Sequence, residues 1–201
     1  MEETDNYRTI EQLSEGIYKE KGSKFLAFAY PVTTENEVKE LLKELRKKYY
    51  DARHHVYAFR LGADLKTFRC SDDGEPSNSS GPPVLGQIQS HELTNILIVV
   101  VRFFGGTKLG VPGLIHAYRT AAANAIENST IIEKFEQDEF TIEFGYAVMN
   151  DVMRILKDEN PEQSHQQFDN TCSINLSTRK KNSNHLRELL LKVQGLSIID
   201  A

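Results

Sequence analysis

The fold is decided by residues 96–114, which read ILIVVVRFFGGTKLGVPGL. The first six residues are apolar, so neither face of a strand carries a polar residue, and this run predicts a strand buried on both faces. The next part is dense in glycine, with Gly105, Gly106, Gly110 and Gly113 inside nine residues. Glycines at this density permit backbone conformations and close approaches that a Cβ would forbid. An Ala-rich helical pattern is predicted to begin at Leu114.

The glycine-rich segment, residues 105–113, is a candidate anion site. A loop that leaves a strand and opens a helix can point backbone N–H groups at an anion. Arg102 and Lys108 add two cations, which suit a phosphate or a carboxylate-rich protein surface. The glycine spacing fits neither the phosphate loop of nucleotide-binding proteins nor the dinucleotide fingerprint. A structural alternative stays open, in which the glycines let the helix pack closely on the sheet and Arg102 pairs with Asp72 or Asp73.

Three carboxylates, those of Asp72, Asp73 and Glu75, lie in a segment rich in turn-forming residues, residues 71–83. Such a segment is expected to be either a flexible loop or a functional one. The carboxylates can hold Mg²⁺, accept hydrogen bonds from backbone amides or pair with arginine. The alternative is that they provide turn chemistry and nothing more. The spacing of acidic residues excludes a calcium-binding hand.

His54 and His55 are adjacent, and on a strand adjacent side chains point to opposite faces. They therefore cannot both face one site, and packing in the interior is the alternative for each. The other histidines show no ligand spacing, and neither cysteine nor any serine lies in a nucleophile motif. The sequence predicts no metal site and no cofactor, and it identifies no catalytic residues. A non-enzymatic role is favoured.

Composition limits the class of protein. The 201 residues suit one large domain or two small ones, and the net charge of −5 means that any nucleic-acid contact must come from a local patch. The first thirty residues lack the pattern of a signal peptide, and the longest apolar run is far below the roughly twenty residues that cross a bilayer. We expect a cytoplasmic protein without a membrane partner. Cys70 and Cys172 are expected to be reduced.

In the first half, a helix is predicted to follow Thr34, because Thr34 and Glu37 form a capping-box pattern before apolar residues at helical spacing. The other strands predicted in this half are residues 16–20, 23–30, 55–60 and 67–70. The mostly charged residues 133–139 then separate two patterns. We predict an N-terminal domain of residues 1–135 and a C-terminal domain of residues 136–201.

The second half is predicted to follow the order strand, helix, strand, strand, helix, strand. Its first helix is expected to be capped by Asn150 or Asp151 and to end before Pro161, and its second carries an apolar stripe that ends at Gly195. The strands are predicted at residues 140–147, 166–168, 172–177 and 196–199. This order indicates the split βαβ arrangement of ferredoxin-like domains. Residues 179–181 form a basic turn before the last helix, which serves either solubility or a weak RNA contact.

Four motifs in this order resemble those of the IMPACT/YigZ family. They are SKFLA at residues 23–27, DARH at 51–54, DDGEP at 72–76 and VVVRFFGGTKLG at 99–110. The second half resembles the small C-terminal domain of bacterial members. The resemblance implies an α+β protein whose N-terminal domain is like the second domain of a small-subunit ribosomal protein and domain IV of elongation factor G. The C-terminal domain is expected to be ferredoxin-like.

The resemblance also implies a function. Eukaryotic relatives are translational regulators that act by protein binding and restrain a kinase pathway of the amino-acid starvation response. For bacterial relatives, nucleic-acid or ribosome binding has been suggested. This chain departs from the family pattern at residues 77–83 and 109–114, and His116 stands where arginine is common. An anion site would then rely more on Lys24, Arg53, Arg102 and Lys108.

The sequence therefore favours a regulator of translation. Its expected partner is the ribosome, an RNA or a translation-associated protein, and no DNA specificity is evident. The alternative is an enzyme or binding protein for a phosphorylated small molecule, in which Asp72 or Asp73 holds Mg²⁺ and Lys108 contacts phosphate. Direct RNA binding through both domains is a third possibility. The predicted binding residues are Lys24, Arg53, His54, Asp72, Asp73, Glu75, Arg102, Gly105, Gly106, Lys108, Gly110 and Gly113.

Overall fold

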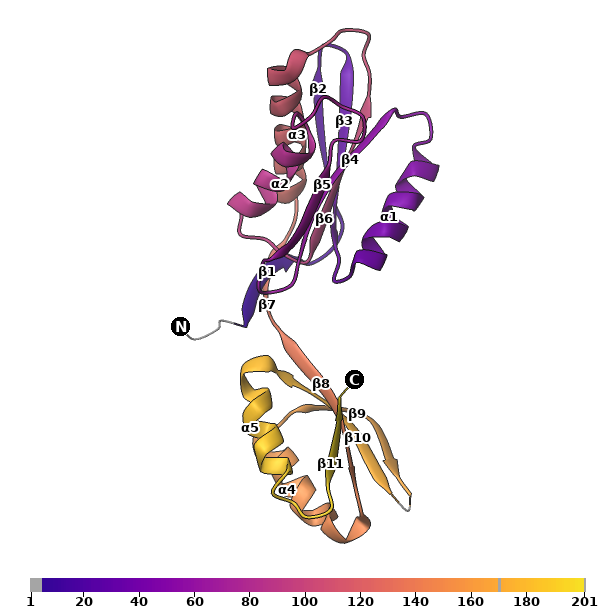
Figure 1. The fold of residues 1–201 in the computed structure, drawn as a ribbon. Coiled ribbons are helices and arrows are strands. Elements are labelled where there is room, and N and C mark those ends of the chain that lie inside the picture. Colours follow the sequence, from indigo (N-terminus) through magenta and orange to yellow (C-terminus); the bar gives the residue numbers. More distant parts are fainter. Residues whose placement is uncertain (1–4, 170, 201) are drawn as a thin grey trace. The chain divides into compact units, whose positions relative to one another are not determined.

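The computed structural model describes residues 5–169 and 171–200. These residues divide into two compact units (Figure 1). The first unit is residues 7–134, and the second comprises residues 5 and 6 together with the described part of 135–200. Both combine helices with β-sheet, which confirms the α+β class. No helix in the described part of the chain is both long and apolar enough to cross a membrane.

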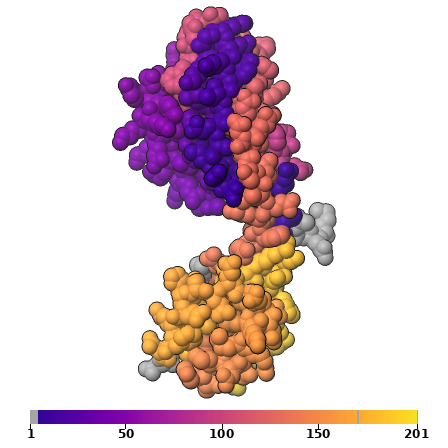
Figure 2. All heavy atoms as spheres, turned by 180° about the vertical axis from the view of Figure 1, so that it is seen from behind, coloured from indigo at the N-terminus to yellow at the C-terminus, as the bar shows by residue number. Residues whose placement is uncertain are grey.

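In the described residues of the first unit, five strands form one antiparallel sheet in the order β2-β3-β6-β4-β5. The strands are β2 (Ser14–Glu20), β3 (Ser23–Pro31), β4 (His54–Leu61), β5 (Thr67–Ser71) and β6 (Ile96–Phe103). The predicted run of residues 96–101 lies in the central strand β6 and is fully buried, as expected. Figure 2 shows the opposite situation at the edge of the sheet, where β2 (indigo) reaches the surface. Besides this sheet, β1 (Asn6–Ile10) pairs with β7 (Ile131–Phe135), a pairing that the sequence did not predict.

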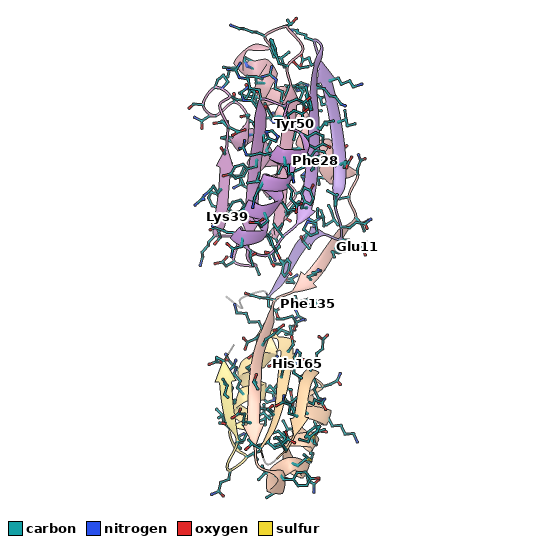
Figure 3. All side chains as sticks on the ribbon, turned by 90° about the vertical axis from the view of Figure 1, so that its right-hand side faces the viewer. Glu11, Phe28, Lys39, Tyr50, Phe135 and His165 are labelled. Carbon is teal, nitrogen blue, oxygen red and sulfur yellow. The ribbon has the colours of Figure 1, made fainter. Side chains whose placement is uncertain are left out.

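Helices cover both faces of the first sheet, which is why β6 has no polar face. Helix α1 (Glu35–Lys48) packs Val38 and Leu45 on one face, where Phe28 of β3 lies between the helix and the sheet (Figure 3). Helices α2 (Gly81–Ser90) and α3 (Gly110–Glu127) cover the other face. The predicted capping box of α1 is confirmed, because the Thr34 side chain accepts from the Glu37 N–H and the Glu37 carboxylate accepts from the Thr34 N–H.

Two predictions in the first unit were wrong at helix starts. The segment of residues 71–83, expected to be a loop, includes the first turn of α2. Pro82 and Pro83 stand in that turn, where a missing N–H removes no helical hydrogen bond. Helix α3 begins at Gly110 rather than at Leu114. Gly110, Pro112 and Gly113 are therefore part of its first turn. In both cases glycine and proline, which are typical of turns, occupy the first turn of a helix, so the sequence pattern did not indicate where the helix begins.

The second unit follows the predicted order of elements. They are β8 (Gln137–Phe144), a 3₁₀ turn η1 (Tyr146–Val148), α4 (Met149–Glu159), β9 (Glu162–Phe168), β10 (Cys172–Arg179), α5 (Lys180–Leu190) and β11 (Ser197–Asp200). Its described residues form a four-stranded antiparallel sheet in the order β11-β8-β10-β9. Both helices contribute to one core against this sheet.

Details of the second unit differ from the predictions. The N-cap of α4 is Val148, whose side chain makes no capping bond, so neither Asn150 nor Asp151 caps this helix. The preceding 3₁₀ turn carries the chain into α4 instead. Helix α5 ends at Leu190, well before Gly195.

The basic turn predicted at residues 179–181 is the junction of β10 and α5. Arg179 donates to both oxygens of Asp5, at 2.8 and 2.7 Å, and Lys180 lies 2.9 Å from Glu136. Arg179 also stacks on the Phe135 ring, with its guanidinium carbon 3.5 Å from the ring centroid. Two of the three basic residues thus have acidic partners inside their own unit, which weakens the case for an RNA contact there.

Candidate functional site

The acidic loop, residues 72–75, links the three helices of the first unit. It follows edge strand β5 and leads into α2, at the end of the sheet where β6 ends and α3 begins (Figure 1). Each of its three carboxylates binds groups associated with a different helix: Asp72 binds α2, Asp73 binds α1 and Glu75 binds α3. The loop is therefore an internal brace.

Asp72 takes the place of an N-cap side chain for α2. Its Oδ1 accepts from the Ser80 and Gly81 N–H groups at 3.0 and 2.8 Å and from the Ser80 hydroxyl at 2.7 Å. Its Oδ2 accepts from the Asn78 N–H at 2.8 Å. Burial opposes the negative charge, but these hydrogen bonds outweigh it and lower the pKa of Asp72. A carboxylate eight residues upstream thus stabilises a helix start whose own Ser80 makes no cap bond.

Asp73 joins α1 to the start of β4. Its Oδ1 accepts from the Arg46 guanidinium at 2.7 Å, and its Oδ2 accepts from the His55 N–H at 2.6 Å. Its carbonyl oxygen lies 2.8 Å from Nδ1 of His54. Burial opposes the charge of Asp73, yet the bonds from Arg46 and His55 prevail and lower its pKa. Both carboxylate oxygens are therefore already in use.

The Glu75 carboxylate is more deeply buried than that of Asp73, whose side chain is 20% exposed. The side chain of Glu75 is 4% exposed, and its Oε1 accepts from Arg102 Nη1 at 2.5 Å and from the Tyr118 hydroxyl at 2.7 Å. Nε2 of His54 lies 4.0 Å from the same oxygen. Burial and the nearby carboxylate raise the pKa of Tyr118, so its hydroxyl remains a hydrogen-bond donor. The Glu75 carboxylate thus connects Arg102 of β6 with Tyr118 of α3 through charge-assisted hydrogen bonds inside the unit.

The sequence left open an internal pairing of Arg102 with a carboxylate of the acidic loop, and the partner in the structure is Glu75 rather than Asp72 or Asp73. Those two carboxylates are held by α2 and by Arg46, and the longer side chain of Glu75 reaches the buried guanidinium. Arg102 stands beside His54 on β4 and Phe25 on β3 in the strand register. Its side chain is only 7% exposed, so its positive charge is buried inside the unit and not presented to a partner.

The glycines of the glycine-rich segment serve different purposes. A Cβ on Gly105 would stand 1.9 Å from the carbonyl carbon of Gly22, so the segment lies directly on the β2–β3 turn. The Gly105 N–H donates to the Ser23 hydroxyl at 3.1 Å. Gly106 instead has φ +87° and open space around it. The segment is thus fixed to the sheet at one residue and exposed at the next.

Five exposed side chains lie around this same end of the first sheet, and we call this set the loop face. It consists of Lys24, Arg53, Phe104, Lys108 and Val111, all exposed. The three cations have no ion pair within the part of the chain that the structure describes. Phe104 is 56% and Val111 46% exposed, and the sequence reasoning missed both. An apolar side chain next to a glycine-rich turn was the signal that could have identified them.

The predicted binding residues therefore fall into two groups. His54, Asp72, Asp73, Glu75 and Arg102 come together as an internal network, whereas Lys24, Arg53 and Lys108 remain on the surface. Of the predicted glycines, Gly105 contacts the β2–β3 turn, Gly106 is exposed, and the other two lie in the first turn of α3. Within the described residues, no cluster of three His, Cys, Asp or Glu side chains is arranged to hold a metal ion. The chemistry available at this end of the sheet is recognition of a surface by cations and apolar side chains.

A second feature lies between α2 and α3, and the sequence reasoning missed it because α2 was not predicted. It is a shallow groove of about 540 Å³. The residues that line it are Asn78, Pro82, Pro83, Gly86, Gln87, Ile115 and Arg119.

A comparison with known protein families identifies the domain that contains these features. Residues 21–126, which include the acidic loop, β6 and nearly all of α3, match the Impact N-terminal domain. The chain belongs to the IMPACT family. This confirms the resemblance of the four motifs and covers more than half of the chain.

Two relatives show the extent of the similarity. IMPACT family member YvyE of Bacillus subtilis (strain 168) is 31% identical over 129 residues, which cover 64% of this chain and 59% of that protein. IMPACT family member YigZ of Escherichia coli (strain K12) is 32% identical over 138 residues, which cover 68% of each. The chain thus spans about three fifths of YvyE and two thirds of YigZ.

Solved structures extend the comparison beyond the matched domain. The crystal structure of an hypothetical protein superposes with a TM-score of 0.74 at 23% identity and covers 98% of both chains, which shows a shared fold. The structure of the two-domain translational regulator Yih1 is 26% identical and covers 59% of this chain. Its TM-score of 0.38 is too low to support a comparison of folds.

Proposed function

We propose that this IMPACT family member is a non-enzymatic, cytoplasmic regulator of translation that acts through its loop face. The family resemblance supports the role, since eukaryotic relatives regulate translation by protein binding. The partner is proposed to be ribosomal, an RNA or another translation-associated protein. The finer fold assignment belongs to the same proposal: a first domain of about residues 1–135 like domain IV of elongation factor G, and a ferredoxin-like second domain of about residues 136–201.

One observation carries this proposal. All three carboxylates of the acidic loop accept hydrogen bonds from groups of the same chain. They fix three helices at the end of the sheet and are therefore not available to a partner. What remains available to a partner is the loop face, which combines Lys24, Arg53 and Lys108 with two exposed apolar side chains. A rigid, mixed surface of this kind suits recognition, because little ordering is needed on binding.

The same observation disfavours the alternative of a phosphorylated small molecule with Mg²⁺. Both oxygens of Asp72 and of Asp73 already accept hydrogen bonds from N–H or guanidinium groups. A metal ion would have to displace these donors and release α2 or α1 from the loop. Since no observation favours such a site, we do not propose it.

The second unit is not proposed to bind RNA through its open sheet face. Phe140, Ile142 and Phe144 of β8 point into the core, so Glu139 and Glu143 point to the other face. Carboxylates on this face repel phosphates. Within the described residues, the strands present no row of aromatic side chains on this face on which bases could stack. We assign partner recognition to the first unit.

Co-sedimentation of the full chain with ribosomes from its native host tests the proposal. We compare the wild type with the variant Phe104→Ser/Lys108→Glu on the loop face. The wild type is expected to move with ribosomal particles or with a translation factor, and the variant to lose this association by roughly tenfold or more. Ribonuclease treatment of the same fractions separates an RNA partner from a protein partner.

The matched control is Phe68→Ser/Lys66→Glu. Phe68 is 53% exposed, close to the 56% of Phe104, and it lies on β5 opposite Arg60, towards the other end of the sheet. This control is expected to sediment like the wild type. If the wild-type chain stays in the free-protein fractions, or if both variants behave alike, the proposed function is wrong.

A further inference from the structure

The groove between α2 and α3 carries an inference that is independent of the loop face. The two helices pack beside each other on one face of the first sheet (Figure 1). Residues of both helices line the groove. Pro82 and Pro83 of α2 and Ile115 of α3 give it half-buried apolar walls. Its volume of about 540 Å³ lies within the range of sites that bind small ligands or short peptide segments.

Gly86, one of the lining residues, is not required to be glycine by the packing of the chain itself. It lies in the middle of α2, and its φ is not positive. Apart from its chain neighbours and the backbone of its own helix, no atom comes within 4 Å of where its Cβ would be. The other helical glycines of the described residues differ. Gly110 has φ +71°, and a Cβ on Gly81 or Gly113 would meet Ser71 or Leu109 at about 3 Å. Since glycine inside a helix is unfavourable, its presence here points to something outside the chain that needs the space.

The groove is held open before any partner arrives. Asp72 caps the first turn of α2, and Pro82 and Pro83 fix the backbone of that turn. On the other side, α3 is fixed by the contact of Tyr118 with Glu75. The walls are therefore preorganised, which lowers the entropy lost on binding.

The charge of the groove defines its occupant. Arg119 stands one helical turn after Ile115, is exposed, and forms no ion pair within the described part of the chain. No carboxylate lines the groove, and Gln87 and Asn78 add amide donors and acceptors. One cation beside an apolar floor suits a single carboxylate next to an aliphatic side chain. A nucleic acid or a nucleotide phosphate chain would call for several cations.

We infer that this groove binds a short acidic peptide segment of a partner protein. An aliphatic side chain of the peptide lies over Gly86 between Pro83 and Ile115, and an Asp or Glu nearby in the peptide pairs with Arg119. This is a second interaction surface of the first unit, distinct from the loop face.

Selection from a random 12-residue peptide library on phage, with the full chain as bait, tests the inference. Enriched peptides are synthesised with a fluorescent label and their affinities measured by anisotropy. They are expected to share an aliphatic residue with an Asp or Glu close to it. If no peptide is enriched, or if the enriched peptides lack an acidic residue, the inference is wrong.

Two variants place the binding in the groove. Gly86→Leu fills the floor with a good helix former in open space, so the protein is expected to stay folded and lose peptide binding by tenfold or more. Gln89→Leu, on the same helix but outside the lining, is the control and is expected to bind like the wild type. Equal binding by Gly86→Leu and wild type would refute the site.

Charge reversal tests the carboxylate contact. Arg119→Glu is expected to weaken the acidic peptide by tenfold or more and to gain affinity for the same peptide with lysine in place of its acidic residue. Lys39→Glu is the control, since Lys39 is an exposed cation on α1, which covers the other face of the sheet (Figure 3). If Arg119→Glu and Lys39→Glu weaken the peptide equally, the effect is one of net charge and the inference fails.

Discussion

The acidic loop and the glycine-rich segment meet at the same end of the first sheet, yet they use their residues in opposite ways. The acidic loop turns its charges inward, where Asp72, Asp73 and Glu75 each satisfy donors of the same chain. The glycine-rich segment is fixed at Gly105 and presents exposed side chains beside it. A loop dense in carboxylates is thus a structural brace, and the loop without acidic residues is the better candidate for recognition.

The difference has a simple physical cause. Helix starts and buried arginines leave unsatisfied donors, and carboxylates are the strongest acceptors that a chain can supply to them. A tight turn with a positive φ does not leave buried donors that need a carboxylate, so the side chains beside it stay in solvent. This comparison predicts an order of effects, which the following substitutions test.

Glu75→Ala should have the largest effect. It leaves the buried Arg102 guanidinium without its counter-charge and the Tyr118 hydroxyl without an acceptor, so we expect a loss of about 3–5 kcal/mol in the free energy of unfolding. Urea denaturation followed by circular dichroism measures it. Glu92→Ala is the control, because Glu92 is 79% exposed and faces Arg8 at 3.6 Å. A loss below about 1 kcal/mol for Glu75→Ala would mean that the brace is not internal.

Gly105→Ala should have the next largest effect. The new Cβ would stand 1.9 Å from the backbone of Gly22, so the glycine-rich segment or the β2–β3 turn must move. We expect a destabilisation of about 2–3 kcal/mol in the same urea experiment. Gly106→Ala meets no atom but must adopt φ +87°, and should lose only about 1 kcal/mol. Equal losses for the two variants would contradict a fixed point at Gly105.

Asp72→Asn should lower stability by about 1–2 kcal/mol at neutral pH, because the charged cap of α2 is lost. It should also change the pH dependence. The pKa values of Asp72 and Asp73 are below 3.8 in the folded state, so the unfolded chain binds more protons around that pH. Their contribution is complete well above pH 3.8 and is lost as the pH falls through the lower native values.

Thermal unfolding between about pH 6 and pH 3 tests this sign. The wild type should become less stable as the pH falls, and Asp72→Asn should show a flatter decline. Asp64→Asn is a control, since Asp64 is 57% exposed and lies 4.0 Å from Lys66. A decline for Asp72→Asn as steep as that of the wild type would show that the cap does not depend on charge.

Gly86→Ala should have the smallest effect and the opposite sign. Its methyl group meets no atom within 4 Å, and alanine is favoured over glycine inside a helix. We expect an increase of about 0.5–1 kcal/mol in the free energy of unfolding. Together with Gly105→Ala, it separates a glycine required by packing from one that the chain does not require. Destabilisation by Gly86→Ala would reveal a constraint in α2 that the structure does not show.

Much of the fold was predictable where a local pattern has a single explanation. The apolar run at residues 96–101 predicted a doubly covered strand, and Thr34 with Glu37 predicted the start of α1. Helix α2 was missed because its cap, Asp72, stands eight residues upstream and its first turn holds two prolines. A sequence pattern limited to the helix and the residues next to it does not include that cap.

The candidate site was predictable in membership but not in arrangement. The sequence indicated that Asp72, Asp73, Glu75 and Arg102 belong together, but it left open which carboxylate pairs with Arg102. Strand register contributes to this pairing, because it places Arg102 between Phe25 and His54, where its guanidinium meets the Glu75 carboxylate. The groove at Gly86 was not predictable either, since it exists only where two helices pack.

The sequence by itself determined the family, the α+β class and the central strand, because motifs and short-range periodicity are local properties of the chain. Only the tertiary structure decided which charges face inward and which side chains are left for a partner. The physical reason is that a carboxylate binds whichever donor the fold brings within about 3 Å, and contacts such as Glu75 with Tyr118 join residues 43 positions apart.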